Sequence, residues 1–336
     1  MRAVARLYGW STVMLVAGLV GTGCGSSAGK AGNGSAGTEG LGAGGTAEVA
    51  ASQLPYLPCA LDQRVGQFSI ELAERYTSVG GQVFDGLAPK DAPTQVASDA
   101  DCQLLRSPQL ECDPGCEPST QACAEDNQCV PRPVAHDLGA VTITGLAVPL
   151  VLHANDVTKS YSNPPSPRLP QPGYAPGADL RLASSGGDYA PIALRGWGVA
   201  ELAGVESPIP VRRGVPTELR WQAPSDAGPA RVHLELNINH HGSNKSWIEC
   251  DVADSGSATI PVELVDRLFE SGESGYPTLT VTRRTASSTS IDPGCVELLV
   301  LSQSTSDVQL DDLDSCSSAA DCNPGQTCRP YELYCE

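Results

Sequence analysis

Cysteine is the residue type in this sequence with the greatest capacity for chemistry. The chain has 336 residues and 13 cysteines. Cys24 stands alone directly after an apolar segment, and the others lie between Cys59 and Cys335. The cysteines other than Cys24 form three groups by position. The group of six is Cys59, Cys102, Cys112, Cys116, Cys123 and Cys129. The group of two is Cys250 and Cys295, and the group of four is Cys316, Cys322, Cys328 and Cys335. Even groups are typical of self-contained disulfide modules, so we expect these cysteines to be oxidised.

Each group is expected to form its own bridges. Within the two clusters we expect the first cysteine to pair with the third and the second with the fourth. The predicted bridges are Cys59–Cys102, Cys250–Cys295, Cys112–Cys123, Cys116–Cys129, Cys316–Cys328 and Cys322–Cys335. A bridge between groups would contradict this partition.

Zinc is the alternative for clustered cysteines. Structural zinc sites use Cys pairs two to four residues apart, followed by a second Cys or His pair. Only Cys112 and Cys116 approach this spacing, and no second pair follows them. We therefore expect disulfides, with no metal and no cofactor.

Two adjacent histidines are the other candidate for a metal site. His240 and His241 follow an alternating apolar segment, where a hairpin loop is the simpler interpretation. A metal site there would need a third ligand, for which Asp251 and Asp254 are candidates. His233 falls on the polar side of the same segment and is expected to face solvent. His136 and His153 have no neighbouring partner pattern.

Two short matches to catalytic or cofactor-binding motifs occur, but their surroundings do not support either function. A G-x-S-x-G match at 25–29 and a G-x-G-x-x-G match at 40–45 lie in a glycine-rich stretch without the flanking strand and helix that both chemistries require. The acidic residues Asp307, Asp311, Asp312 and Asp314 lack the glycine-centred spacing of a calcium loop, so a solvated linker is expected. No catalytic residue is predicted, and the chain is not expected to be an enzyme.

The N-terminus predicts export. Arg2 and Arg6 precede an apolar run at 7–20, and small residues at 21–23 precede Cys24. This order is typical of a signal peptide, here 1–23, and the run is too short for a confident membrane span, which needs roughly 20 residues.

The stretch 19–24, Leu-Val-Gly-Thr-Gly-Cys, resembles the lipobox of bacterial lipoproteins. The resemblance implies that Cys24 is acylated and anchors the mature chain to a membrane. Gly21 departs from the larger aliphatic residue usual at that position, and Gly21 and Gly23 also suit the ordinary signal peptidase. Removal of Cys24 leaves an even number of cysteines, which favours lipidation. In such lipoproteins an Asp directly after the cysteine holds the protein at the inner membrane. Here Gly25 occupies that position, so the resemblance implies the outer membrane, on its periplasmic or cell-surface face.

A flexible tether follows at 24–53. Its Gly, Ser and Ala composition is typical of a random coil, with a mean end-to-end distance of roughly 28 Å. Towards the other end, the run Asp-Cys-Asn-Pro-Gly-Gln-Thr-Cys at 321–328 resembles the short cysteine-rich, Dickkopf-like repeats of myxobacterial surface proteins. With the lipobox and the tether, the chain resembles myxobacterial surface lipoproteins that carry such repeats. The resemblance to this family implies no activity for the chain, because the family has none established.

Composition narrows the class of partner. The formal net charge is −18, which argues against nucleic acid because binding to phosphates depends on Lys and Arg. The chain has 35 glycines and 27 prolines, which favours short strands with many turns over long helices.

Apolar residues alternate with polar ones in several segments, a pattern of half-buried strands. The segments lie at 68–72, 141–144, 180–182, 219–221, 232–239 and 279–282. One helix is expected from Pro261 to Gly272, with Leu264, Val265, Leu268 and Phe269 on one face.

The predicted fold is mainly β, with two antiparallel, immunoglobulin-like β-sandwich domains and small disulfide-rich modules. The first domain is expected at 54–203, interrupted by a cysteine-rich insertion at 102–129 and a proline-rich loop at 163–177. The second is expected at 204–308, and a cystine module at 309–336 closes the chain.

These features predict a non-enzymatic, lipid-anchored protein of the cell envelope that binds or organises an envelope protein or polysaccharide. The alternatives are an enzyme or accessory subunit acting on envelope polysaccharide or protein, and a purely structural spacer. A pocket gathering His240, His241 and a carboxylate, or two carboxyls with raised pKa values, would favour an enzyme. Exposed aromatic rings such as Trp197 and Trp247 would favour sugar binding.

Overall fold

The structure is a computed structural model that describes residues 49–89, 92–166, 168–238, 246–271, 277–310, 316, 318–328 and 335. The expected signal peptide, Cys24 and most of the tether lie outside the described residues, as do His240 and His241. Glu48–Glu336 forms one compact unit. Within the described ranges, no helix combines the length and the apolar character that a membrane span requires.

The described chain is mainly β. Its strands are β1 (Arg64–Leu72), β2 (Thr77–Val83), β3 (Thr94–Asp99), β4 (Cys102–Arg106), β5 (Gln121–Cys123), β6 (Cys129–Pro131), β7 (Val141–Thr144), β8 (Leu150–Leu152), β9 (Tyr161–Ser162), β10 (Asp179–Ser184), β11 (Ala193–Trp197), β12 (Ile209–Val211), β13 (Thr217–Arg220), β14 (Arg231–Asn237), β15 (Ser246–Ala253), β16 (Ser257–Ile260), β17 (Thr278–Ser290) and β18 (Cys295–Leu310). Helix α1 spans Val262–Glu270, and short 3₁₀ turns occupy Ala51–Gln53 (η1) and Ala319–Asp321 (η3). The described residues of all six alternating segments lie in or at the end of strands, and α1 confirms the predicted helix.

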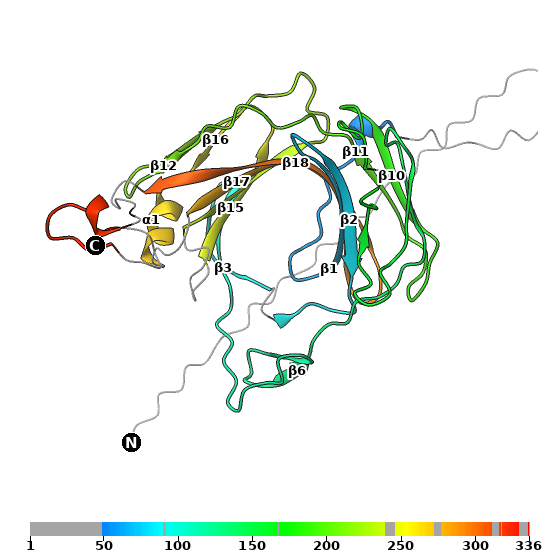
Figure 1. The fold of residues 1–336 in the computed structure, drawn as a ribbon, viewed down its shortest axis with the longest axis horizontal. Helices are drawn as coiled ribbons and strands as arrows, with labels where there is room; N and C mark the ends of the chain where they lie inside the picture. Colours follow the sequence, from blue (N-terminus) through cyan, green and yellow to red (C-terminus); the bar gives the residue numbers. More distant parts are fainter. Residues whose placement is uncertain are drawn as a thin grey trace, which may run out of the picture. The chain divides into compact units, whose positions relative to one another are not determined.

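One ten-stranded sheet organises the fold. Its order is β3-β4-β15-β14-β17-β18-β1-β2-β9, with β12 also paired to β18. The long strands β17 and β18 run through the middle of it, as Figure 1 shows. β18 is parallel to β1 and β12, whereas β17 is antiparallel to both of its neighbours.

Alternation gives this sheet two chemically distinct faces, because successive side chains of a strand point to opposite sides. On β17, for example, Leu279 and Val281 are buried among apolar residues, while Thr280 and Thr282 line a cavity on the other side. We name the first side the core face and the second the groove face. The groove face comprises Gln67, Gln103, His233, Glu235, Glu249, Asp251, Thr280, Thr282, Arg284, Glu297, Leu299, Leu301 and Gln303.

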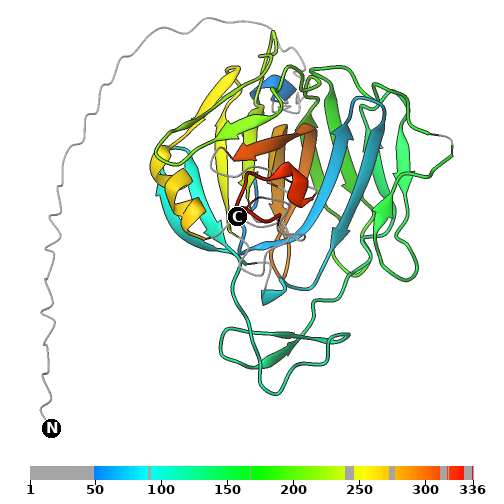
Figure 2. The ribbon, with the colours of Figure 1, turned by 60° about the vertical axis from the view of Figure 1, so that its left-hand side comes forward.

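Two hydrophobic clusters cover the core face. In the first, β1, β2 and β18 pack against a second sheet of order β11-β10-β7-β8, with Phe68, Leu182 and Leu298 at its centre. In the second, β14, β15 and β17 pack beneath β12, the β13–β16 pair and α1. Helix α1 contributes the four apolar residues predicted to share a face, all of them buried. Figure 2 shows α1 and the second sheet on opposite flanks of the central strands.

The predicted boundary near residue 204 does not separate two sheets. β1, from the first half, pairs in parallel with β18, from the second, and β4 pairs with β15. The hydrophobic clusters do divide near that point, since most of the first comes from residues before 200. The immunoglobulin-like topology expected for each half is not confirmed, because a single sheet runs through both.

Two of the predicted disulfides are wrong. Cys59 pairs with Cys295, and Cys102 pairs with Cys250, so both bridges connect the group of six to the group of two. The reason is the strand order: Cys102 of β4 lies directly opposite Cys250 of β15, and residues 59–64 run beside the start of β18. The partition into groups of six, two and four therefore fails.

The clustered cysteines pair as predicted. The bridges are Cys112–Cys123, Cys116–Cys129, Cys316–Cys328 and Cys322–Cys335. Their sequence separations are 11 and 13 in the first cluster and 12 and 13 in the second, so the two modules share one pairing scheme. Six disulfides indicate an extracellular or exported protein.

Candidate functional site

A cavity on the groove face is the candidate site. It has a volume of about 660 Å³ and is lined from β3, β4, β15, β14, β17, β18 and β1, together with residues 58–61 and the turn at 100–101. These strands are consecutive neighbours in the sheet. Most of the strand residues in the lining are Gln, Thr, His, Glu, Asp or Arg, and Leu299 and Leu301 of β18 add an apolar part. The cavity therefore lies on the side of the sheet that neither hydrophobic cluster covers.

A row of acidic residues crosses β14 and β15. Glu235 lies directly opposite Glu249 in the antiparallel pair. Glu249 accepts a hydrogen bond from the Trp247 indole at 2.8 Å, and its other oxygen lies 3.5 Å from His233 Nε2. Burial of Glu249 opposes its charged form, but His233 and Trp247 outweigh this, so the pKa of Glu249 is lowered. Glu249 is therefore a carboxylate at neutral pH.

Asp251 is the centre of a second polar cluster. It accepts hydrogen bonds from Tyr56 Oη at 2.6 Å and from Arg284 Nη2 at 3.2 Å, and Arg231 pairs with its other oxygen. Burial again opposes ionisation, but Tyr56, Arg231 and Arg284 together lower the pKa of Asp251. Burial also raises the pKa of the Tyr56 hydroxyl, which stays protonated and donates to Asp251 while accepting from Arg284 Nε at 2.9 Å.

A segment at 54–63, which we name the strap, crosses one end of the groove face. The Leu57 amide donates to the Ala286 carbonyl at 2.9 Å, and the Cys59–Cys295 bridge fastens the strap to β18. Beneath it, Glu297 accepts from the Cys59 amide at 2.9 Å and pairs with Arg64 at 3.1 Å. The Glu297 side chain is only 2% exposed, so this carboxylate holds the strap in place.

The lining carries more negative than positive charge. Its carboxylates are Asp101, Glu235, Glu249, Asp251 and Glu297, and its arginines are Arg64 and Arg284. Glu297 and Asp251 are paired with arginines. The side chains of Asp101 and Glu235 make no hydrogen bond or ion pair with any residue that the structure describes. The groove face thus offers acidic groups that are free to contact a ligand.

The structure separates the two aspartates that were considered as metal ligands. Asp251 lies on the groove face, whereas Asp254 is buried on the other side of the sheet, where it pairs with Arg283 at 2.6 Å. His233, expected to face solvent, instead lines the cavity with its side chain 15% exposed. A site built from His240, His241 and either aspartate lies outside the described residues.

The tryptophans considered for sugar binding do not form an array. Trp247 donates to Glu249, and Trp197 lies in a separate cavity of about 560 Å³ with Pro176, Glu201 and Asp226. Among the described residues, no Trp, Tyr or Phe lines the groove cavity.

His136 has partners that its sequence neighbourhood did not reveal. Its Nδ1 lies 3.2 Å from Asp188 and its Nε2 lies 3.6 Å from Asp85. Asp188 also accepts the Asp137 amide at 2.8 Å, and these interactions lower its pKa. This cluster joins loops at the end of the first hydrophobic cluster, which is a structural role. His153 is exposed.

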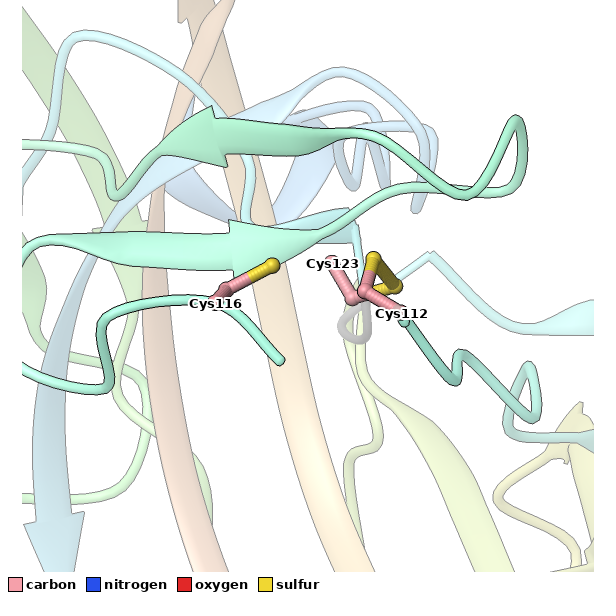
Figure 3. Close-up of side chains that lie close together, drawn as sticks. All are labelled: Cys112, Cys116 and Cys123. Atoms are coloured by element: carbon pink, nitrogen blue, oxygen red, sulfur yellow. A yellow bond between two sulfur atoms is a disulfide. The ribbon is translucent and has the colours of Figure 1, made fainter. Parts of the chain in front are cut away.

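The cysteine clusters bring three sulfur atoms close enough to hold a metal ion, as in Cys112, Cys116 and Cys123 (Figure 3) and in Cys316, Cys322 and Cys328. In each cluster, however, two of the three sulfurs are bonded to each other and the third is bonded to a fourth cysteine. A thiolate, not a disulfide sulfur, is the zinc ligand. These clusters are therefore cystine modules, of which the first projects beyond the sheets on the β5–β6 hairpin (Figures 1 and 2).

Comparison of the chain with protein-family models gave no match, and comparison with curated proteins gave no significant match. The groove face must therefore be interpreted from its own geometry.

Sequence reasoning missed Glu235, Glu249 and Arg284 as site residues. A usable signal existed for the first, since Glu235 and His233 share the polar side of one alternating segment. That alternation shows which residues share a face, but it does not show which strands are neighbours. Glu249 and Arg284 join the site only through the order β15-β14-β17.

Proposed function

We propose that this chain is an exported, lipid-anchored protein of the cell envelope that binds a partner through its groove face. The observation that carries the proposal is the uncovered polar cavity of about 660 Å³ on the central sheet. Its floor belongs to long, regularly paired strands, and its partnered charges are fixed by ion pairs. Rigid, pre-arranged polar groups suit recognition because little conformational entropy is lost on binding.

The sequence supports the anchoring part of the proposal. The lipobox-like stretch at 19–24 and the glycine-rich tether would attach the chain through Cys24 to the outer membrane. Replacement of Cys24 by Ser is expected to move the protein from the detergent phase to the aqueous phase in a partition experiment. Unchanged partitioning would refute the lipid anchor without affecting the binding proposal.

The lowered pKa values of Glu249 and Asp251 argue against a general-acid role for either carboxylate. A general acid that works near neutral pH needs a raised pKa, and the pKa values of Glu249 and Asp251 are both lowered. These carboxylates are suited to hold cations and hydrogen-bond donors.

Site-specific photocrosslinking on intact cells tests the binding proposal. A photoreactive amino acid at Gln303, an exposed position on the groove face, should capture a discrete partner. The matched control is the same amino acid at Glu218 of β13, whose side chain is 69% exposed and lies away from the cavity. Identical products from the two positions, or none from the groove, would overturn the proposal.

A further inference from the structure

Two carboxylates on the groove face repel each other, and a cationic ligand would neutralise this repulsion. Glu235 and Glu249 are directly opposite each other on β14 and β15, where Cβ atoms lie about 4.5–5.5 Å apart and like charges are destabilising. Glu249 is compensated by His233 and Trp247, and Glu235 has no hydrogen bond or ion pair among the described residues. A cationic group placed between the two carboxylates would remove the repulsion.

The rest of the cavity supports the same charge preference. Its five carboxylates face two arginines, and Asp101 is also without a partner among the described residues. The arginines at this surface already have partners: Arg64 pairs with Glu297, and Arg284 and the neighbouring Arg231 both pair with Asp251. The positive charge that complements this surface must therefore come from outside it.

The shape and the neutral part of the lining indicate an extended chain. The lining residues come from seven neighbouring strands, β3 to β1 in sheet order. Six intervals of about 4.8 Å extend over about 29 Å, the length of about eight extended residues. Gln67, Gln103, Gln303, Thr280 and Thr282 lie along it and can donate to and accept from main-chain amides. A glycan is less suited because the described lining residues include no Trp, Tyr or Phe on which a sugar ring could stack.

From this arrangement we infer that the groove face binds an extended peptide segment of another protein that bears Lys or Arg side chains, with Glu235 and Glu249 receiving one of them. The inference rests on the proposed binding function and names the chemistry of its partner. A second copy of this chain is a poor occupant, because each copy carries a net charge of −18. The chain's own tether is also a poor occupant, since residues 25–48 contain Lys30 against Glu39 and Glu48.

The test uses the full chain in a non-ionic detergent and three labelled eight-residue peptides, in which Thr alternates with Lys, with Glu or with Gln. Fluorescence anisotropy is expected to show binding of the Lys peptide only, with an affinity that falls as NaCl is raised, because salt screens the charges. Glu235→Gln should weaken binding of the Lys peptide about tenfold, the effect of one charge-assisted hydrogen bond. Glu218→Gln, with the same change of charge at an exposed position, should leave it unchanged.

The outcomes separate this inference from the proposal on which it depends. If the Glu or Gln peptide binds as well as the Lys peptide, or if both Gln variants weaken binding equally, the groove has no cationic preference and the inference fails. Crosslinks from Gln303 would then still support a partner of other chemistry. Thermal unfolding of each variant is the folding control, and Glu235→Gln is expected to unfold at or slightly above the wild-type temperature because it removes a like-charge pair.

Discussion

Arg283 and Arg284 are consecutive residues of β17, and they show how differently the two faces of the central sheet use charge. Because side chains alternate along a strand, Arg283 enters the core face and Arg284 the groove face. The Arg283 side chain is 2% exposed and that of Arg284 is 16% exposed. Both pair with an aspartate, but their surroundings differ.

The donors of Arg283 are committed to fixed partners. Nε donates to Asp254 at 2.6 Å, and Nη2 donates to Asp254 at 3.2 Å and to the Gln222 carbonyl at 2.7 Å. Nη1 donates to the Glu201 carbonyl at 2.8 Å and to that of Ala200 at 3.4 Å. Asp254 is further satisfied by the Trp221 indole at 2.8 Å. Arg283 therefore joins the loop near residue 200, where the two hydrophobic clusters meet, to the central sheet.

Within the described residues, Arg284 forms hydrogen bonds only with side chains, those of Tyr56 of the strap and Asp251. Asp251 is shared with Arg231. All of these groups reach solvent in part, and Arg284 donates to no main-chain carbonyl of the residues that the structure describes. The comparison shows that the buried charge of Arg283 on the core face is a structural link, whereas Arg284 and Asp251 on the groove face remain partly exposed.

Replacement of Arg283 by Met should produce the largest loss of stability. The variant leaves the buried Asp254 carboxylate without its counter-ion, which costs about 3–5 kcal/mol in comparable buried pairs. Urea unfolding at pH 7 measures the free energy of unfolding. The double variant Arg283→Met, Asp254→Leu is the control and should recover part of the loss, because no charge is left buried. A loss no greater than that of Arg284→Met would contradict the distinction between the faces.

Replacement of Cys59 and Cys295 by Ser tests whether their disulfide holds the strap against the groove face. Loss of a native disulfide typically costs about 2–4 kcal/mol, so we expect about 3 kcal/mol here. The local effect should be on the strap, with faster hydrogen exchange at the Leu57 amide that now donates to Ala286. Removal of Cys112–Cys123 is the control, since that bridge lies in the projecting hairpin. Equal protection of Leu57 in both variants would show that the strap does not depend on its bridge.

Arg284→Met should destabilise the fold much less than Arg283→Met. Asp251 keeps Arg231 and Tyr56 as partners, so the expected loss is about 1–2 kcal/mol, the scale of one hydrogen bond between charged groups. The same urea experiment measures it, with Arg220→Met on the exposed surface of β13 as the control for loss of an arginine. An effect above that of Arg283→Met would reverse the comparison.

Local patterns in the sequence predicted the local structure. Alternation at 68–72 and 232–239 identified β1 and β14, and the shared apolar face identified α1. The clustered disulfides were predictable because their cysteines lie within 13 residues of each other. Even Arg283 had a signal: it continues the apolar positions Leu279 and Val281 with period two, which places it on the core face.

What could not be predicted depends on strand order. Four cysteines allow three pairings, and the choice of Cys59–Cys295 and Cys102–Cys250 follows from β1 lying beside β18 and β4 beside β15. The same non-local pairings bring His233, Glu249 and Arg284 to one cavity. Periodicity assigns each residue to a side of its own strand, and only the assembled sheet decides whether that side meets solvent, a core or a groove.

The smallest expected effect concerns stability as a function of pH. The free energy of unfolding should depend on pH differently in Asp251→Asn and in the wild type. The pKa of Asp251 is lowered in the folded state by Tyr56, Arg231 and Arg284 against the opposing effect of burial. Its stabilising contribution is therefore complete above the ordinary pKa of 3.8 and is lost as the pH falls through the lower, folded value. The gap in unfolding free energy between wild type and Asp251→Asn should be constant from pH 7 to about 5 and should narrow below about pH 4. Urea unfolding across this range measures it, with Glu218→Gln as the exposed control. A gap that stays constant at acid pH would mean that Asp251 acts through packing, and the groove face would then resemble the core face more closely than its contacts indicate.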